Sequence, residues 1–381
     1  MFGVLTGASL LWKMLASTMM LGFLLGSCDI PLFEDDRHPA EAERERASDE
    51  EPADSPDEEP ADSTNDEASD DPPGDEPAPG TATPPAAAGD GEVAVYMGWR
   101  DAAAVDDFSD WLGRPVWAHD FLDHRQGWGA VADPRAQLDV WEEWVAASDD
   151  RRLVLSVPLL IESTTGDFAG GANGAYDGHF TELAQNLVDR GLEDTVIRLG
   201  WEFNGSTFPW AVERGQVDDY KRFWNRAVAA MRGVDGAAFA FDWCPNITLD
   251  ATGLPFDDMY PGDDVVDIIG LGFYDYYWDN PDASPEARWQ WLRDVDNGLV
   301  DHREFASAHD KPISFPEYGL WEQGTRVGGG GDNPYFIEQL ATWIADSDIA
   351  YHGYNNVDAT ADHRLTSFPD AQQAYLEAFG S

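Results

Sequence analysis

The sequence contains few lysines and few cysteines. Three of its 381 residues are lysine, and the 23 Lys and Arg together are set against 73 Asp and Glu, which gives a formal net charge of -50. A nucleic-acid-binding surface needs basic side chains to neutralise phosphates, so this balance excludes that class of partner. The two cysteines, Cys28 and Cys244, are too few for a disulfide framework or a cysteine-rich zinc site.

Several catalytic motifs are also missing. The chain has no HExxH zinc motif, no GxSxG nucleophile turn, no Gly-rich phosphate loop ending in Lys and no calcium-loop pattern. We therefore predict a protein that uses no cofactor and binds no metal.

The acidic excess is spread over the whole chain. Residues 29–91 carry 22 Asp and Glu against three Arg, and residues 92–381 carry the other 51 acidic residues against 19 basic ones. Self-repulsion of this size favours solubility over compactness, and counter-ions relieve it. With so little lysine, it predicts a salt-loving source. An ordinary acidic secreted protein is the alternative.

The N-terminal part divides into two segments. An apolar stretch ends in Leu25-Gly26-Ser27-Cys28, which resembles a bacterial lipoprotein signal with lipid attached to Cys28, although residues 1–28 are also long enough for a retained membrane anchor. Residues 29–91 repeat EEPADS and are rich in Pro and acidic residues, so they predict a disordered linker. We expect an extracellular protein, tethered to the cell surface and touching the membrane through its N-terminus only.

From Val93 onward, short apolar runs alternate with amphipathic stretches. The predicted strands are residues 93–99, 116–121, 153–160, 196–201, 238–243, 266–274, 312–316 and 350–355. The predicted helices are residues 102–112, 134–147, 179–190, 217–232, 285–309, 334–345 and 370–379. Residues 92–381 therefore predict a single α/β domain, a (β/α)8 TIM barrel, which we expect to be monomeric. A doubly wound sheet is the alternative, but its Gly-rich phosphate turn is missing after the first strand.

Carboxylates, amides and aromatic residues follow the predicted strands, where a TIM barrel builds its active site. Aromatic rings can stack on the apolar faces of sugar rings, and two carboxyl groups across a glycosidic bond supply an acid/base and a nucleophile. Glu202 ends the fourth run and Glu317 the seventh, so the two face each other across the barrel mouth. A retaining reaction needs these groups about 5–5.5 Å apart and an inverting one a wider gap. Trp99 at the end of the first predicted strand and His119 near the end of the second are also candidate sugar contacts.

The segments that contain the two glutamates resemble those of glycoside hydrolase family 26, in clan A of the barrel hydrolases. Residues 196–205, VIRLGWEFNG, are similar to the family's strand-four signature, and residues 311–319, KPISFPEYG, to its strand-seven nucleophile segment. Residues 241–246 and 266–274 resemble its fifth and sixth strands. The resemblance implies a retaining enzyme that cleaves a β-linked polysaccharide, first of all an endo-β-1,4-mannanase. A β-1,3/1,4-glucanase and a β-1,3-xylanase are the alternatives, and a non-catalytic carbohydrate-binding barrel is the alternative of another class.

The resemblance also implies residue roles. Glu202 would be the acid/base, Glu317 the nucleophile, and Tyr274 would hydrogen-bond Glu317. The expected sugar-binding side chains are Arg198, Trp201, Asn204, Trp210 and Trp243. Arg198 lies within an apolar strand, so it must pair with a carboxylate. The chain departs from the family in two places: Trp201 stands where the family usually has His, and the eighth strand ends without Trp. Both departures concern the choice of sugar.

Overall fold

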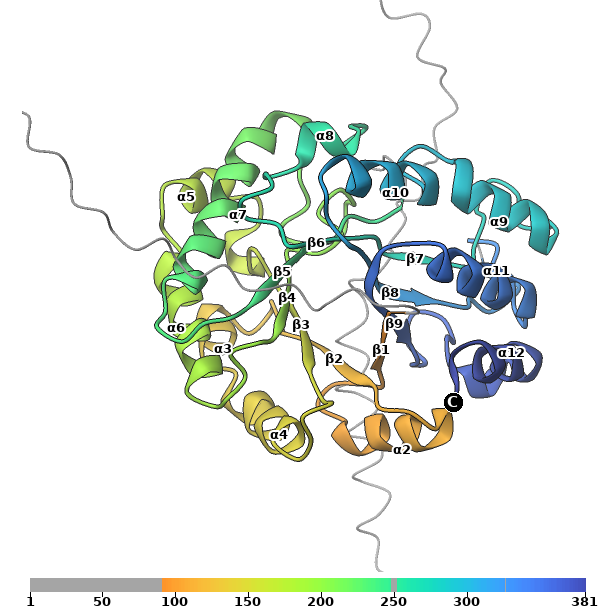
Figure 1. Ribbon diagram of the computed structural model, residues 1–381. Helices are drawn as coiled ribbons and strands as arrows, with labels where there is room; N and C mark the ends of the chain where they lie inside the picture. Colours follow the sequence, from red (N-terminus) through yellow and green to blue (C-terminus); the bar gives the residue numbers. More distant parts are fainter. Residues whose placement is uncertain (1–90, 248–251, 326) are drawn as a thin grey trace, which may run out of the picture. The chain divides into compact units, whose positions relative to one another are not determined.

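The C-terminal part of the chain forms a closed barrel of parallel strands surrounded by helices (Figure 1). The structure is a computed structural model that describes residues 91–247, 252–325 and 327–381. The predicted lipoprotein signal, the lipid site at Cys28 and the acidic linker lie outside the described residues, apart from Gly91. No helix among the described residues is long and apolar enough to cross a membrane.

Eight strands make the barrel, and a short ninth extends it. Neighbouring strands follow the sequence order from β1 to β6, β9 pairs with β1 and β8, and the pairing of β6 with β8 closes the ring. The strands are β1 (Glu92–Tyr96), β2 (Trp117–Phe121), β3 (Leu153–Val157), β4 (Val196–Leu199), β5 (Ala240–Trp243), β6 (Ile268–Gly270), β7 (Phe273–Tyr274), β8 (Ile313–Gly319) and β9 (Ile349–Asn355). The predicted TIM barrel is confirmed.

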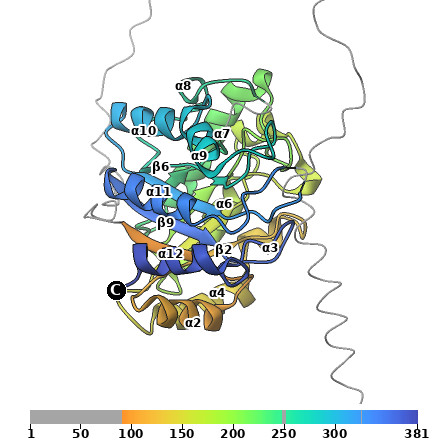
Figure 2. The same ribbon diagram turned by 90° about the vertical axis from the view of Figure 1, so that its right-hand side faces the viewer.

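The helices lie on the outside of the barrel (Figures 1 and 2). They are α2 (Ala102–Leu112), α3 (Trp128–Ala132), α4 (Arg135–Val145), α5 (Phe168–Ala172), α6 (Asp177–Val188), α7 (Val217–Arg232), α8 (Phe256–Met259), α9 (Pro285–Asp294), α10 (Leu299–Ala308), α11 (Pro334–Ala345) and α12 (Pro369–Phe379). The first helix and the last lie side by side, where Phe108 packs edge-on against Tyr375 with their rings 6.0 Å apart. This contact joins the two ends of the barrel domain.

Two predicted elements are divided in the structure. The helix predicted over residues 285–309 breaks into α9 and α10, because Asn297 adopts the left-handed conformation (φ 57°) and Gly298 precedes the new helix. The strand predicted over residues 266–274 breaks into β6 and β7 at Gly272, whose backbone N–H donates to the carbonyl oxygen of Pro245 on the neighbouring segment. Both breaks depend on tertiary contacts.

The barrel interior is arranged in layers because successive residues of a strand point to opposite faces. The bottom layer is apolar and comprises Ala94, Trp117, Val154, Val196, Ala240, Ile268, Ala350 and Tyr351. Two residues further along four of these strands, the interior becomes polar, with His119, Ser156, Arg198 and Asp242, each at most 2% exposed. This polar layer lies directly below the carboxyl ends of the strands.

Candidate active site

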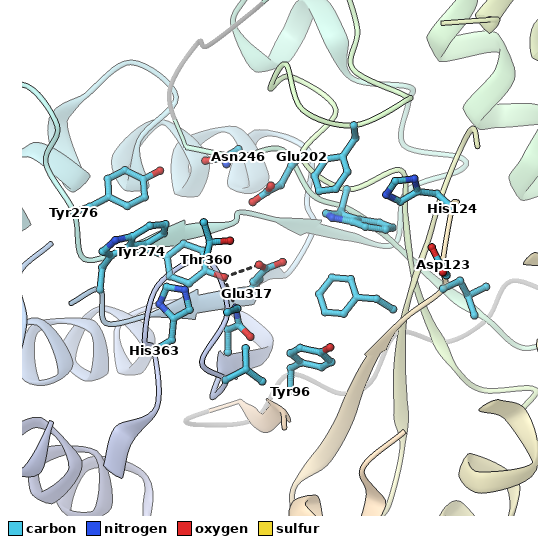
Figure 3. Close-up of a pocket in the computed structure, with 18 of the residues that line it drawn as sticks. Tyr96, Asp123, His124, Glu202, Asn246, Tyr274, Tyr276, Glu317, Thr360 and His363 are labelled. Atoms are coloured by element: carbon cyan, nitrogen blue, oxygen red, sulfur yellow. Dashed lines mark hydrogen bonds between the residues drawn. The ribbon is translucent and has the colours of Figure 1, made fainter. Parts of the chain in front are cut away.

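A cavity opens at the carboxyl ends of the strands (Figure 3). Its lining includes Tyr96, Phe121, Asp123, His124, Trp201, Glu202, Phe208, Asn246, Tyr274, Tyr276, Glu317, Trp321, Asn355, Thr360 and His363. Glu202 and Glu317 lie at its centre, on opposite sides, with their carboxyl groups directed toward the space between them. The structure therefore brings together the two glutamates that the sequence singled out.

Glu317 is held on both of its carboxyl oxygens. Its Oε2 accepts a hydrogen bond of 2.7 Å from the guanidinium of Arg198, and its Oε1 accepts one of 2.6 Å from the hydroxyl of Tyr274. The amide of Asn355 donates in turn to that hydroxyl, at 2.5 Å. Burial, followed by the nearby charge of Glu317, raises the pKa of Tyr274 well above its usual value, so the phenol keeps its proton and acts as a donor.

Glu202 lies on the tight turn that follows β4. Its backbone has φ 51°, in the left-handed region, and Gly200 shortly before it has φ 56°. A left-handed non-glycine residue costs on the order of 1–3 kcal/mol and is maintained only where its surroundings enforce it. Here the backbone N–H of Glu202 donates to the carbonyl oxygen of Cys244 at the end of β5, at 2.8 Å. This backbone geometry directs the carboxyl group into the cavity.

Arg198 connects the two glutamates electrostatically. It belongs to the polar layer, is 0% exposed, and interacts with the charges of both Glu317 and Glu202. The segment at Gly272 lies close to this group: a Cβ added there would be 3.1 Å from Oε1 of Glu202 and 3.4 Å from a terminal nitrogen of Arg198. The prediction that Arg198 pairs with a site carboxylate is met by Glu317. Its guanidinium lies beneath the carboxylates, so direct contact with a sugar is not its role here.

Trp201 lines the cavity beside Glu202, as the sequence led us to expect. Its ring packs edge-on against Phe121 at 5.4 Å and against Trp210 at 4.5 Å. Trp210 is fully buried, and its indole N–H donates to the carbonyl oxygen of Trp201 at 2.7 Å. Trp210 thus supports the wall of the cavity from behind, and the prediction that it contacts sugar directly is wrong.

The prediction that Trp243 contacts the sugar is also wrong. Asp242 points into the barrel, where its carboxylate accepts hydrogen bonds from Ser314 and Tyr351. The next residue along a strand points the opposite way, so Trp243 is directed outward, fully buried against the helices, with its indole N–H donating to the hydroxyl of Tyr220 at 3.0 Å. Trp243 belongs to the hydrophobic core.

Three further candidates do not line the cavity. Asn204 is fully buried and exchanges hydrogen bonds with the backbone of Asn246, at 2.7 and 2.9 Å, so it positions that cavity residue. His119 is bonded to the hydroxyl of Ser156 within the polar layer, at 2.8 Å. Trp99 is 40% exposed but lies outside the cavity lining.

The residues that sequence reasoning missed lie mostly on loops. Asp123 and His124 follow β2, and His363 lies on the long connection after β9. His363 is buried, its Nδ1 lies 2.6 Å from the carbonyl oxygen of Leu320, and burial lowers its pKa. Their only sequence signal was the density of aromatic and polar residues after the strand ends.

A sequence comparison agrees with the geometry of the site. The family model described as Glycosyl hydrolase family 26 matches residues 133–298. The resemblance to glycoside hydrolase family 26 is confirmed. The match includes Glu202 and Tyr274, whereas Glu317 lies beyond it, so the assignment of Glu317 to this site rests on its own sequence segment and on its contacts.

Known proteins similar to this chain include a mannan endo-1,4-beta-mannosidase from Bifidobacterium adolescentis. It is 25% identical over 162 residues, which are 42% of this chain and only 16% of that protein. A family 26 β-mannanase structure from Bacteroides ovatus has 16% identity and a TM-score of 0.51 and covers 76% of this chain and 87% of its own. An endo-β-1,4-mannanase structure from Cellulomonas fimi has 18% identity and a TM-score of 0.54, and the match covers 76% of this chain and 69% of that one. The structural likeness supports the fold.

Proposed function

We propose that this chain is a retaining glycoside hydrolase in which Glu317 is the nucleophile and Glu202 the acid/base. The observation that carries the proposal is the shared cavity at the strand ends, with Glu202 opposite a Glu317 that is held by both Arg198 and Tyr274. Glycoside hydrolases cleave a glycosidic bond with two carboxyl groups that face each other across the substrate cavity, and aromatic residues in its lining can bind the sugar rings.

The contacts of Glu317 suit a nucleophile. Hydrogen bonds from Arg198 and Tyr274 hold both oxygens of the carboxylate and fix its orientation. The carboxylate attacks the anomeric carbon while Glu202 gives its proton to the departing glycosidic oxygen, so a glycosyl–enzyme ester forms and the leaving sugar departs as an alcohol. Glu202 then accepts a proton from a water molecule, whose oxygen attacks the same carbon, and Glu317 is released as a carboxylate.

For the substrate we propose a β-linked polysaccharide, with β-1,4-mannan first. Support comes from the relatives and family 26 structures described as mannanases. Trp201 places an indole beside the acid/base. An apolar ring there offers a sugar a stacking face and one N–H donor, and the choice among mannan, β-1,3/1,4-glucan and β-1,3-xylan depends on how a hydroxyl fits against it.

The test is hydrolysis of a panel of these polysaccharides in high salt by wild type, Glu202→Ala and Glu317→Gly. Both variants are expected to lose at least 10³-fold in kcat/KM, on the order reported for removal of a catalytic group. Azide should restore turnover of the Glu202 variant on an activated substrate and give a β-glycosyl azide with retained configuration. Glu322→Ala removes an exposed glutamate that is not in the cavity lining and serves as the control, with activity unchanged.

Three outcomes decide the proposal. If wild type binds these glycans and cleaves none, the chain is a carbohydrate-binding barrel and the enzyme proposal fails. If Glu317→Gly keeps full activity, the residue assignment fails. If the products have inverted configuration, the nucleophile role of Glu317 fails while the hydrolase remains.

We also propose that the chain is tethered at the cell surface through Cys28. The support is the Leu25-Gly26-Ser27-Cys28 pattern and the acidic, Pro-rich stretch that follows it. Expression with labelled fatty acid is expected to give a labelled membrane-bound protein, and Cys28→Ser should abolish the label. Label retained in that variant would contradict lipid attachment at Cys28.

A further inference from the structure

A row of three aromatic rings leads away from the catalytic centre. Residues 274, 276 and 278 alternate along the chain after β6, and their rings lie nearly parallel: Tyr274 to Tyr276 at 6.5 Å and 21°, and Tyr276 to Trp278 at 5.0 Å and 26°. Tyr274 bonds Glu317, Tyr276 lines the cavity, and Trp278 is next in the row. The row therefore connects the nucleophile to a ring at the protein surface.

Exposure changes sharply along this row. Tyr274 is 9% and Tyr276 4% exposed, whereas Trp278 is 37% exposed. Within the part of the chain that the structure describes, Trp278 and Trp99 are the large apolar side chains that remain exposed. Exposed apolar rings beside a cavity mark binding surfaces more often than isolated ones do.

Trp278 is also held in place. Tyr276 covers one side of its ring, and Trp291 from α9 packs against it edge-on, with centroids 5.5 Å apart and planes at 74°. A ring fixed in this way loses little conformational freedom when a ligand stacks on it. Trp99 differs, because the guanidinium of Arg100 lies 3.8 Å from the centre of its ring.

Tyr276, the middle ring of the row, lies at one end of the cavity. In Figure 3, Asp123 and His124 lie at the other end, with Glu202 and Glu317 between them. A polymer bound across the two glutamates would leave the cavity over Tyr276 and meet Trp278 next. Burial and chemistry thus favour one occupant for the exposed ring, namely the continuing sugar chain.

We propose that Trp278 is an outer sugar-binding subsite, on which a pyranose ring of a bound β-linked polysaccharide stacks beyond the units held at Glu202 and Glu317. This subsite rests on the proposed function, and it adds that the protein binds a chain longer than the two units at the cleavage point. Binding energy gained at such a remote unit can raise kcat/KM for long substrates without changing the chemistry.

The experiment measures kcat/KM for a series of β-linked oligosaccharides, from the shortest that is cleaved to a hexasaccharide, cut from the best polysaccharide of the panel. Wild type should improve with length. Trp278→Ala and Trp278→Leu should lose roughly 5- to 30-fold on the longest substrates, mainly in KM, and match wild type on the shortest. Trp278→Leu keeps apolar packing against Trp291 without a flat ring, and Trp278→Phe, which keeps a ring, should retain most of the length dependence.

Trp99→Ala is the matched control, since it removes the other exposed Trp, and it is expected to behave as wild type at every length. If wild type cleaves no β-linked glycan, the proposed function fails and this subsite fails with it. If wild type is active and the Trp278 variants follow its length dependence, only the subsite is refuted. An equal loss at all lengths, or the same loss in Trp99→Ala, also refutes it.

Discussion

Replacing Tyr274 by Phe tests how the site holds its nucleophile. The substitution removes one oxygen, whose O–H donates to Oε1 of Glu317 at 2.6 Å and accepts from Asn355 at 2.5 Å. A hydrogen bond to a charged group contributes about 1.5–3 kcal/mol. Without this hydrogen bond, the Glu317 carboxylate is less well aligned for its attack. We therefore expect kcat/KM to fall by about 10- to 150-fold.

The assay compares kcat/KM of the variant and of wild type on polysaccharide and on an activated aryl glycoside. Tyr318→Phe is the control: it removes a fully buried phenol that is bonded to Nδ1 of His352 at 2.8 Å, outside the cavity lining. Its thermal stability should fall while its kcat/KM stays at the wild-type level.

Two results would refute this reasoning. A Tyr274→Phe variant within threefold of wild type on both substrates would show that the hydroxyl does not support catalysis. A Tyr318→Phe variant with the same loss of activity would show that the effect comes from weakened packing of the barrel.

Three other predictions follow from the same structure. Gly272→Ala should lower kcat by about tenfold and leave the protein folded, because the added Cβ would lie 3.1 Å from Oε1 of Glu202. Gly178→Ala, whose Cβ would point into open space, should leave both kcat and folding unchanged. Burial raises the pKa of Asp242 to about 6, so the folded state keeps a proton that the unfolded state releases at lower pH. This adds about 3 kcal/mol to the free energy of unfolding below pH 4, and the contribution is lost as pH rises through 6. Chemical unfolding at a series of pH values should show a free energy of unfolding that depends less on pH in Asp242→Asn. Removing salt by dialysis should diminish the circular dichroism signal, and an unchanged spectrum would contradict the halophile prediction.

The barrel could be predicted because its strands are buried on both faces. Each of the eight main strands falls within or overlaps a predicted apolar run, as parallel strands covered by helices require. The sequence did not show where the predicted strand over residues 266–274 and the predicted helix over residues 285–309 break. Gly272 and Asn297, which lie at these breaks, adopt their conformations through contacts with distant segments. Periodicity records burial, and it carries no information about these local interruptions.

For the site, the sequence was informative about carboxylates and misleading about aromatic residues. Parallel strands end on one rim, so Glu202 and Glu317 had to meet there whatever the details of the loops. The direction of a side chain, however, reverses with each residue along a strand, and a shift of one position moved Trp243 from the cavity to the core. Tyr276 and Trp278 follow a strand end by a few residues, and their places depend on packing against Trp291 and Trp321.

The polar layer beneath the cavity explains why catalysis and stability are coupled in this barrel. Arg198 is fully buried, and its charge is balanced chiefly by Glu317, which itself opens to the cavity with a 13% exposed side chain. Removing one partner of a buried ion pair leaves the other charge uncompensated, at a cost of about 3–5 kcal/mol. Glu317→Gly therefore removes the nucleophile, the counter-charge and the hydrogen-bond acceptor of Arg198, whereas Glu317→Gln removes the nucleophile and the charge but keeps an oxygen that can accept from Arg198. Both variants should be inactive and both should melt below wild type, with the glycine variant melting at the lowest temperature, so the difference between them measures the contribution of the hydrogen bond.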